Sequence, residues 1–537
     1  MRISFTAATL LVIAFGTLFT DSAYPRSPEN QVFQFSYSAE SNPPGGLPSR
    51  KATLYLWIPE QCKRLRGLVI LCTNVPEHML VGHPAIREAC RRNDLGLVWS
   101  VPTFWNFAKE YKGQDLAQLA FLDELLAGLA EGSGYEEVTT VPWLPIGESG
   151  HLLMVVGMLD ERPERTIAGI CVKNPHYPKR NRNVPLLWTF GTSQEWGQKD
   201  SDIRKSWDKA PEGFTNWART REEARWPLSI VIEPGTGHFH CSDALAEYFG
   251  EYIDAAVEAR LGKNGLVPVD LESGWVATLP MPGLGDQPPI PYAQASPDQR
   301  KAAWFFSENL ALRAQMISRT NWSAETALPG FVAGTGTSVS PFHFNSVTEI
   351  HVVTDGVFDV GASFLPQIPE GFHSAGENLA VPGAAPTIEW ICGPFAPTAD
   401  GKFRIALDRT WKTGAAAYLI ARWPGGARTR PAVQPAIVRF QENRQGSPQE
   451  ITFEPVGSLS RNSAPVRLQA TSNSGLPVEF TVISGPAIIR DNHLELTTIP
   501  PRAKFPVEIK VAAWQWGRPA DPAVQTAGPV FQTISVH

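Results

Sequence analysis

The sequence has little of three things. It holds only six cysteines in 537 residues, no basic block, and a single long apolar run at its start. Because it lacks a Cys-x-x-Cys pair and ligand-spaced His and Cys residues, we expect neither a metal site nor a disulfide scaffold. A net charge of −6 without a basic block argues against nucleic-acid binding. No later run is long enough to cross a bilayer.

The first residues predict export. A positive charge precedes the apolar stretch 7–19, and small or polar residues follow at 20–23. This order is typical of a signal peptide, predicted here as 1–23, with an uncleaved anchor as the alternative. The expected location is the periplasm, cell surface or exterior of a bacterium. Export allows one disulfide, for which Cys62 and Cys90 are candidates.

The next part of the chain, residues 24–265, alternates apolar strands with helical segments. Hydrophobic residues make up 43% and charged residues 19% of the chain, as in globular proteins. Strands are predicted at 67–72, 95–101, 141–146, 167–172, 184–190 and 228–233, with amphipathic helices at 83–93, 116–134 and 241–262. This alternation predicts an α/β fold, a mostly parallel sheet flanked by helices.

The composition changes after residue 265. Residues 266–295 are rich in proline and glycine and predict a linker. Short runs with alternating apolar residues follow, separated by turn residues, and they predict antiparallel β-sandwich structure. A polar stretch divides this part into a middle β-rich region, 296–445, and a last β-sandwich domain, 449–537.

The stretch VPWLPIGESGHLL places Ser149 at the corner between a predicted strand and a predicted helix. A serine is a poor nucleophile until a base removes its proton and nearby donors stabilise the oxyanion. A sharp strand-to-helix turn exposes the hydroxyl and puts the next N–H at the helix N-terminus. Gly147 relieves crowding in such a turn. The alternative is a non-catalytic serine near a helix start.

The segment Gly147-Glu148-Ser149-Gly150-His151 resembles the G-x-S-x-G motif of the α/β-hydrolase superfamily, with His151 in place of the last glycine. The resemblance covers about the first 265 residues and implies Ser149 as nucleophile. The family places its histidine after the last strand of the sheet. Here that position is His238, in a Gly-rich loop after 228–233, and His240 is the alternative.

The same resemblance implies an acid after the preceding strand and an oxyanion hole beside the serine. Glu195 is the favoured acid, with Asp200 as the alternative. The oxyanion donors are expected to be the backbone N–H groups of Gly150 and of Thr73 or Asn74. The strand ends also carry aromatic residues. Trp105 and Trp196, together with His151, are candidates for the substrate pocket, although tryptophans often only pack a loop.

The last domain resembles bacterial immunoglobulin-like modules of secreted and surface proteins. The resemblance rests on the turn SGLPV at 474–478 and on 511–517, VAAWQWG, and it covers about 85 residues. It implies a spacer or a module that contacts a surface or polymer, not a catalytic unit.

The sequence predicts an exported serine hydrolase that acts on carboxylic esters through a Ser149–His238–Glu195 triad and an acyl-enzyme, without metal or cofactor. Acyl or aryl esters on a polysaccharide are the favoured substrates. Two alternatives stay open. One is a serine peptidase, because ester and peptide hydrolysis use the same parts. The other is a non-catalytic surface-binding protein in which His151 marks a degenerate motif.

Overall fold

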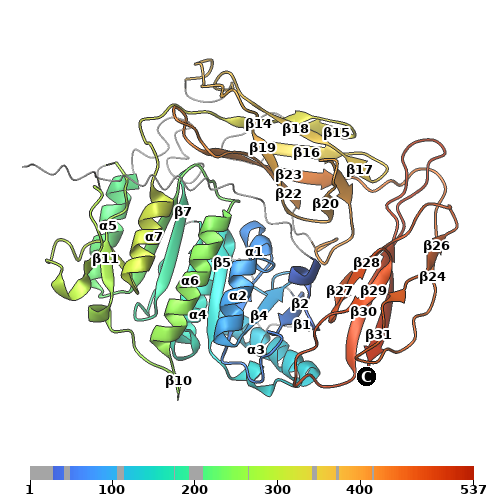
Figure 1. Ribbon diagram of the computed structural model, residues 1–537, viewed down its shortest axis with the longest axis horizontal. Helices are drawn as coiled ribbons and strands as arrows, with labels where there is room; N and C mark the ends of the chain where they lie inside the picture. The colour runs from blue at the N-terminus through green and yellow to red at the C-terminus, as the bar shows by residue number, and fades with distance from the viewer. Residues whose placement is uncertain are drawn as a thin grey trace, which may run out of the picture.

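The computed structural model describes residues 28–41, 49–105, 114–173, 176–192, 210–263, 265–282, 284–340, 348–370, 374–413 and 417–537. Three parts are visible in Figure 1: a sheet covered by helices, a β-rich region above it, and a second β-rich region at the C-terminal end. The predicted signal peptide lies outside the described residues. No helix within the described ranges has the length and apolar character needed to span a membrane.

The first part is built on an eight-stranded sheet in the order β1-β2-β4-β3-β5-β6-β7-β8. Its strands are β1 (Phe35–Ser41), β2 (Arg50–Trp57), β3 (Gly67–Leu71), β4 (Leu95–Ser100), β5 (Trp143–Glu148), β6 (Gly169–Val172), β7 (Leu186–Gly191) and β8 (Leu228–Glu233). Pairs from β4 to β8 are parallel, whereas β1–β2 and β2–β4 are antiparallel. The mostly parallel sheet is therefore as predicted. The strands β3 to β8 are entirely buried, as continuous apolar runs require.

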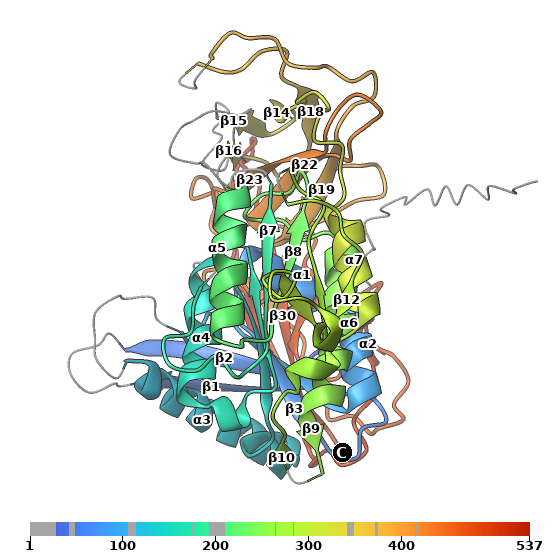
Figure 2. The same cartoon turned by 90° about the vertical axis from the view of Figure 1, so that its left-hand side faces the viewer.

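Helices cover both faces of this sheet. They are α1 (Val75–Leu80), α2 (Pro84–Asn93), α3 (Gln114–Ser133), α4 (Leu152–Glu161), α5 (Ala210–Glu223), α6 (Asp243–Arg260) and α7 (Glu308–Ser318). Figure 2 shows α3, α4 and α5 on one side and α2, α6 and α7 on the other. Helix α6 illustrates why the sequence predicted it: the Ser242 side chain accepts a hydrogen bond from the Leu245 N–H, which caps the first turn.

Residues 266–295 do not form the separate linker that was predicted. They contain β11 (Trp275–Ala277) and β12 (Ile290–Pro291), which form a small sheet with β13 (Ala303–Phe305), and the pair β9 (Leu261–Gly262) and β10 (Gly265–Leu266) precedes it. Leu279 and Met281 belong to the same hydrophobic cluster as the large sheet. The apolar residues between the prolines therefore pack onto the α/β part, and helix α7 completes that part.

The middle region is centred on a five-stranded sheet in the order β15-β16-β23-β22-β19. Its strands are β14 (Pro329–Ala333), β15 (Thr337–Val339), β16 (Thr348–Val352), β17 (Val357–Phe358), β18 (Val360–Phe364), β19 (Thr387–Cys392), β20 (Phe395–Pro397), β21 (Phe403–Ile405), β22 (Ala417–Trp423) and β23 (Ala432–Phe440). The prediction of purely antiparallel pairing is wrong for β16 and β23, which pair in parallel. Alternating burial along a strand shows which residues face a core but not which strand lies beside it.

The last region is also all-β. Its strands are β24 (Ile451–Phe453), β25 (Val466–Arg467), β26 (Ala470–Ser472), β27 (Glu479–Ser484), β28 (Ala487–Arg490), β29 (His493–Leu496), β30 (Val507–Trp514) and β31 (Val530–Val536). Its immunoglobulin-like character stays a prediction. The region packs on both neighbours: Arg502 pairs with Glu137 of the α/β part, and the Trp516 indole donates to the Thr354 carbonyl of the middle region. All six cysteines are buried, and Cys62 and Cys90 are not bridged.

Candidate functional site

Ser149 lies at the corner that its sequence context predicted. Strand β5 ends at Glu148, one short 3₁₀ turn follows, and α4 begins at Leu152. Ser149 has a φ of 53°, a left-handed conformation that a non-glycine residue adopts at a cost of about 1–3 kcal/mol. A side chain at Gly147 would come within 2.5 Å of the His151 carbonyl oxygen, so the tight turn requires glycine there. The strained corner leaves the Ser149 residue half-buried rather than enclosed.

The predicted histidine meets this serine. The Nε2 atom of His238 lies 2.7 Å from the Ser149 hydroxyl oxygen, a hydrogen-bond distance. His238 follows β8 in a loop, and its side chain is 18% exposed. The alternative, His240, is buried beside Glu233. Burial lowers the pKa of His240 to about 4, although the charge of Glu233 acts in the opposite direction. The geometry therefore favours His238 as the partner of Ser149.

A second acidic residue, not predicted from the sequence, lies beside the same nitrogen. An Oε1 of Glu148 is 3.2 Å from Nε2 of His238, and the Glu148 side chain is fully buried. When Nε2 takes up a proton, the imidazole becomes a cation, and a carboxylate at this distance stabilises it. Glu148 directly precedes Ser149 in the motif, so the signal was present. The role of Glu148 toward the imidazole becomes visible only in the folded structure, where His238 lies beside it.

The corner is tied to its neighbour in the sheet by the β3–α1 turn. An Oε1 of Glu77 accepts from the Glu148 backbone N–H at 2.7 Å and lies 2.8 Å from Nδ1 of His151. The Asn74 side chain donates to the Glu148 carbonyl oxygen at 3.3 Å. Glu77 and His151 are both buried. His151 is therefore not a pocket residue as predicted: its ring bonds to Glu77 beneath the corner, where a glycine would leave that carboxylate without this contact.

The residues proposed for the oxyanion hole belong to the turn after β3 and to the corner after β5. Strands β3 and β5 are parallel neighbours, so the turn after β3 lies beside Ser149 and Gly150. Asn74 caps α1 by accepting from the Val75 N–H, and the Thr73 hydroxyl bonds the Ser100 carbonyl oxygen. These contacts use side-chain atoms of Asn74 and Thr73, whereas the proposed oxyanion donors are backbone N–H groups. Which N–H acts stays a prediction.

The loop that carries His238 is anchored by a buried ion pair. Lys173, at the end of β6, donates to Glu233 at 2.8 Å and to the Thr236 hydroxyl at 2.9 Å. Glu233 also accepts from the Ser242 backbone N–H at 3.1 Å, beyond the far end of the loop. Burial alone would raise the pKa of Glu233, but the charges of Lys173 and His240 and the hydrogen bonds from Lys173 and Ser242 together outweigh it and lower that pKa to about 2. Both ends of the loop are thus fixed to one ionised carboxylate.

The remaining predicted residues divide into two groups. Glu195, Asp200 and Trp196 fall outside the described residues, so the acid of the triad stays a prediction. Trp105 is described, and it is 1% exposed, with its ring 2.9 Å from the position that a side chain at Gly157 would occupy. It packs against α4 in the core. The prediction that it lines the substrate pocket is therefore not supported.

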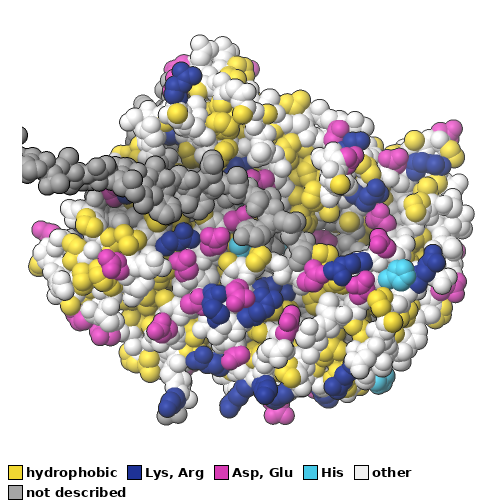
Figure 3. All heavy atoms as spheres, in the orientation of Figure 1, with side chains coloured by type: hydrophobic (Ala, Val, Ile, Leu, Met, Phe, Trp, Pro, Cys, Tyr) yellow, Lys and Arg dark blue, Asp and Glu magenta, His cyan; other side chains and the backbone are white. Residues whose placement is uncertain are grey.

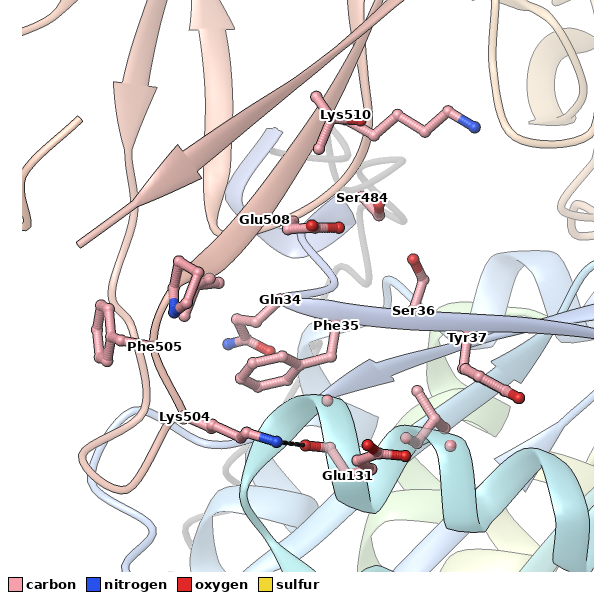
Figure 4. A pocket seen from close by; sticks show the side chains of 16 residues that line it. Gln34, Phe35, Ser36, Tyr37, Glu131, Ser484, Lys504, Phe505, Glu508 and Lys510 are labelled. Atoms are coloured by element: carbon pink, nitrogen blue, oxygen red, sulfur yellow. Dashed lines mark hydrogen bonds between the residues drawn. The ribbon is translucent and has the colours of Figure 1, made fainter. Parts of the chain in front are cut away.

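In the described part of the chain, no group of three or more His, Cys, Asp or Glu residues is placed to hold a metal ion. A cavity of about 430 Å³ lies between β1, α3 and the last β region, as Figure 4 shows. Lys504 spans its edge by donating to the Glu131 carbonyl oxygen at 3.2 Å. None of its lining residues belongs to the Ser149 corner. On the face drawn in Figure 3, basic and acidic side chains are intermixed.

No family model and no curated protein matches this sequence. Structural similarity is found to XC6422 from Xanthomonas campestris, an α/β serine hydrolase without lid (14% identity, 42% of this chain and 96% of that one, TM-score 0.26). The siderophore hydrolase EstA from Aspergillus nidulans (10%, 42% and 96%, 0.31) and the S-formylglutathione hydrolase FrmB from Staphylococcus aureus (12%, 42% and 100%, 0.27) are also similar. At these identities and TM-scores, chemistry has to be inferred from this chain's own side chains.

Proposed function

We propose that the protein is a serine hydrolase of carboxylic esters, with Ser149 as nucleophile and His238 as general base. The observation that carries the proposal is the 2.7 Å approach of His238 Nε2 to a serine hydroxyl held at a strained strand-to-helix corner. A structural serine near a helix start needs neither feature. The strain is maintained by Gly147 and by the buried contacts of Glu77.

The proposed reaction has two halves. His238 Nε2 removes the hydroxyl proton as Ser149 Oγ attacks the ester carbonyl, and backbone N–H groups beside Gly150 stabilise the oxyanion. The protonated imidazole then gives its proton to the departing alcohol, and an acyl-enzyme is left. Water, deprotonated by His238, releases the acid. Glu148 stabilises the imidazolium in both halves, and Glu195 is the proposed residue that orients the ring through Nδ1.

The setting of this chemistry is part of the proposal. We propose export on the basis of the apolar N-terminal stretch, and we propose that the last domain is an immunoglobulin-like module that contacts a surface or polymer. An ester on a polysaccharide is the substrate class that suits both features. A peptidase with the same residues is the second candidate, and a binding protein is the third.

The test compares ester and peptide substrates on the full chain. The protein should hydrolyse p-nitrophenyl acetate and leave peptide p-nitroanilides intact. Ser149→Ala should lower ester hydrolysis by about 10⁴- to 10⁶-fold. Ser307→Ala is the matched control, because Ser307 is a serine at a helix start, where it caps α7 by accepting from the Leu310 N–H, but it lies outside the site.

Three outcomes decide among the candidates. Ester hydrolysis that is lost in Ser149→Ala and kept in Ser307→Ala supports the esterase. Anilide cleavage with the same pattern supports the peptidase instead. Folded protein that turns over neither substrate contradicts both and supports the binding protein.

A further inference from the structure

The middle region covers the candidate site from the carboxyl ends of the strands. A hydrophobic cluster joins the two parts: Val75, Met79, Phe239, Ile391, Cys392, Tyr418, Ile420, Val433 and Ile437. Val75 and Met79 belong to helix α1, which follows the turn proposed to supply an oxyanion donor, and Phe239 follows His238. The other six residues lie on β19, β22 and β23, which are neighbours in one sheet. One sheet therefore spans both loops that flank Ser149, as its place above the α/β part in Figure 1 illustrates.

This sheet is packed on both faces. Along β22, Leu419 points into the core of the middle region, whereas Tyr418 and Ile420 point into the cluster above the site. The alternation is that of a strand with two buried faces. A second contact fixes it: a side chain at Gly235, in the histidine loop, would come within 2.4 Å of the backbone of Pro431. A sheet buried in this way is a fixed cover and not a mobile flap.

Aromatic rings connect the sheet β19–β22–β23 to the proposed general base, His238. The rings of His238 and Phe239 have centroids 4.9 Å apart, and those of Phe239 and Tyr418 are 5.2 Å apart. Tyr418 is 6% exposed. Burial, with the charges of Cys392 and Glu148, raises the pKa of the Tyr418 phenol, so this side chain stays neutral near pH 7. The ring pair thus forms an uncharged wall on the histidine side of Ser149.

The position of the wall decides which half of an ester it contacts. In acyl transfer the general base also protonates the leaving group, so the alcohol oxygen must come within reach of Nε2. The alcohol portion therefore lies on the side of His238, where Phe239 and Tyr418 stand. The acyl portion extends away from that nitrogen.

We propose that the sheet β19–β22–β23 is a fixed cap on the active site, and that Tyr418, packed on Phe239, is a specificity-determining residue that admits small or flat alcohols and excludes bulky ones. The inference rests on the proposed esterase function, because it concerns the leaving group of that reaction. It assigns to the middle region a role that its sequence does not indicate.

The test measures kcat/KM for two acetate esters with one acyl group and different alcohols, methyl and cyclohexyl acetate, by titration of the released acid. Removing the wall in Tyr418→Ala should raise the cyclohexyl-to-methyl ratio by about tenfold or more, since a pocket discriminates by about 10–200-fold per small apolar group. Tyr418→Phe keeps the ring and should leave the ratio within about twofold. Ile420→Val is the matched control, because it loosens the same face of β22 without removing the ring.

The ratio is insensitive to the fraction of folded enzyme, so a partial loss of stability does not imitate the effect. If Tyr418→Ala does not fold, Tyr418→Leu shortens the wall while keeping the site apolar, and the same rise is expected. An unchanged ratio in a variant that still hydrolyses p-nitrophenyl acetate overturns the cap inference and leaves the esterase standing. An equal rise in Ile420→Val also overturns it. Wild-type protein inactive on all three esters overturns the proposed function and this inference together.

Discussion

The α/β part and the middle β region both have apolar cores, but they differ in the charged groups that they bury. Beneath and beside Ser149, buried charged groups make short polar contacts, as between Lys173 and Glu233 or between Glu77 and His151. The core of the middle region is formed by apolar and aromatic side chains, such as Phe358 and Phe403 with ring centroids 5.5 Å apart. Buried charges fix positions at a high desolvation cost, whereas apolar packing fixes shape. The difference supports our proposals that the first part carries the chemistry and that the second shapes access to it.

The strongest test of this contrast compares the two histidines of one loop. His238→Ala should lower kcat by about 10⁴- to 10⁶-fold, because the serine loses its base. His240→Asn, in a buried position away from the serine, should change kcat by less than about tenfold. Steady-state hydrolysis of p-nitrophenyl acetate checks both. A larger loss in the His240 variant would show that the base is assigned to the wrong residue.

Removing one partner of the buried ion pair should have the next largest effect. Lys173→Met leaves the Glu233 carboxylate buried without its cation and should lower the free energy of unfolding by about 3–5 kcal/mol. Lys301→Met is the matched control, since it breaks a surface pair with Asp298 at 2.9 Å and should change stability little. Denaturant unfolding checks both variants. Equal losses in the two would show that the buried pair does not anchor the loop.

Acid should destabilise the same region. His240 has a pKa lowered from 6.5 to about 4, so its neutral form stabilises the fold above pH 6.5, and that contribution is lost as the pH falls toward 4. The loss should amount to roughly 3 kcal/mol. Glu233, with its pKa lowered from 4.5 to about 2, adds a further loss below pH 4.5. Unfolding free energies measured across this range should fall in wild type and stay flatter above pH 4.5 in His240→Asn; parallel curves contradict this account.

Replacing His151 with glycine should lower the stability of the fold. His151→Gly makes the motif G-x-S-x-G but removes the contact of Glu77 with Nδ1, at an expected cost of about 1–3 kcal/mol in unfolding free energy. Glu77→Gln keeps an acceptor oxygen for the Glu148 N–H and should cost less. Thermal unfolding of the two variants ranks them. A His151→Gly protein as stable as wild type would show that the ring is dispensable.

The sequence predicted the α/β part well because its signals are local. Continuous apolar runs such as 67–72 and 228–233 became buried strands, and Ser242 capped its helix. The resemblance to the G-x-S-x-G motif led to His238 as the predicted partner, and its Nε2 lies 2.7 Å from the Ser149 hydroxyl oxygen. What failed depends on distant residues. Nothing in the sequence explained a histidine in place of the last glycine of the motif, because the partner of His151, Glu77, lies 74 positions away in the chain.

The β-rich regions show the same limit more strongly. Alternation identified strands such as β21 and β30, but the parallel pairing of β16 with β23 has no local signature. The prolines of 266–295 indicated a linker, whereas the apolar residues among them joined the α/β core. Nothing near Tyr418 in the sequence points to a serine far earlier in the chain. Such contacts arise only when the parts pack together.

The central claim is that Ser149 is an activated nucleophile, and the most direct measurement is to locate a covalent adduct. The full chain is treated with a fluorophosphonate probe, digested, and analysed by mass spectrometry. We expect the adduct on Ser149, absent in Ser149→Ala and formed far more slowly in His238→Ala. Folded protein that stays unmodified, or an adduct on another residue that persists in Ser149→Ala, would contradict the account.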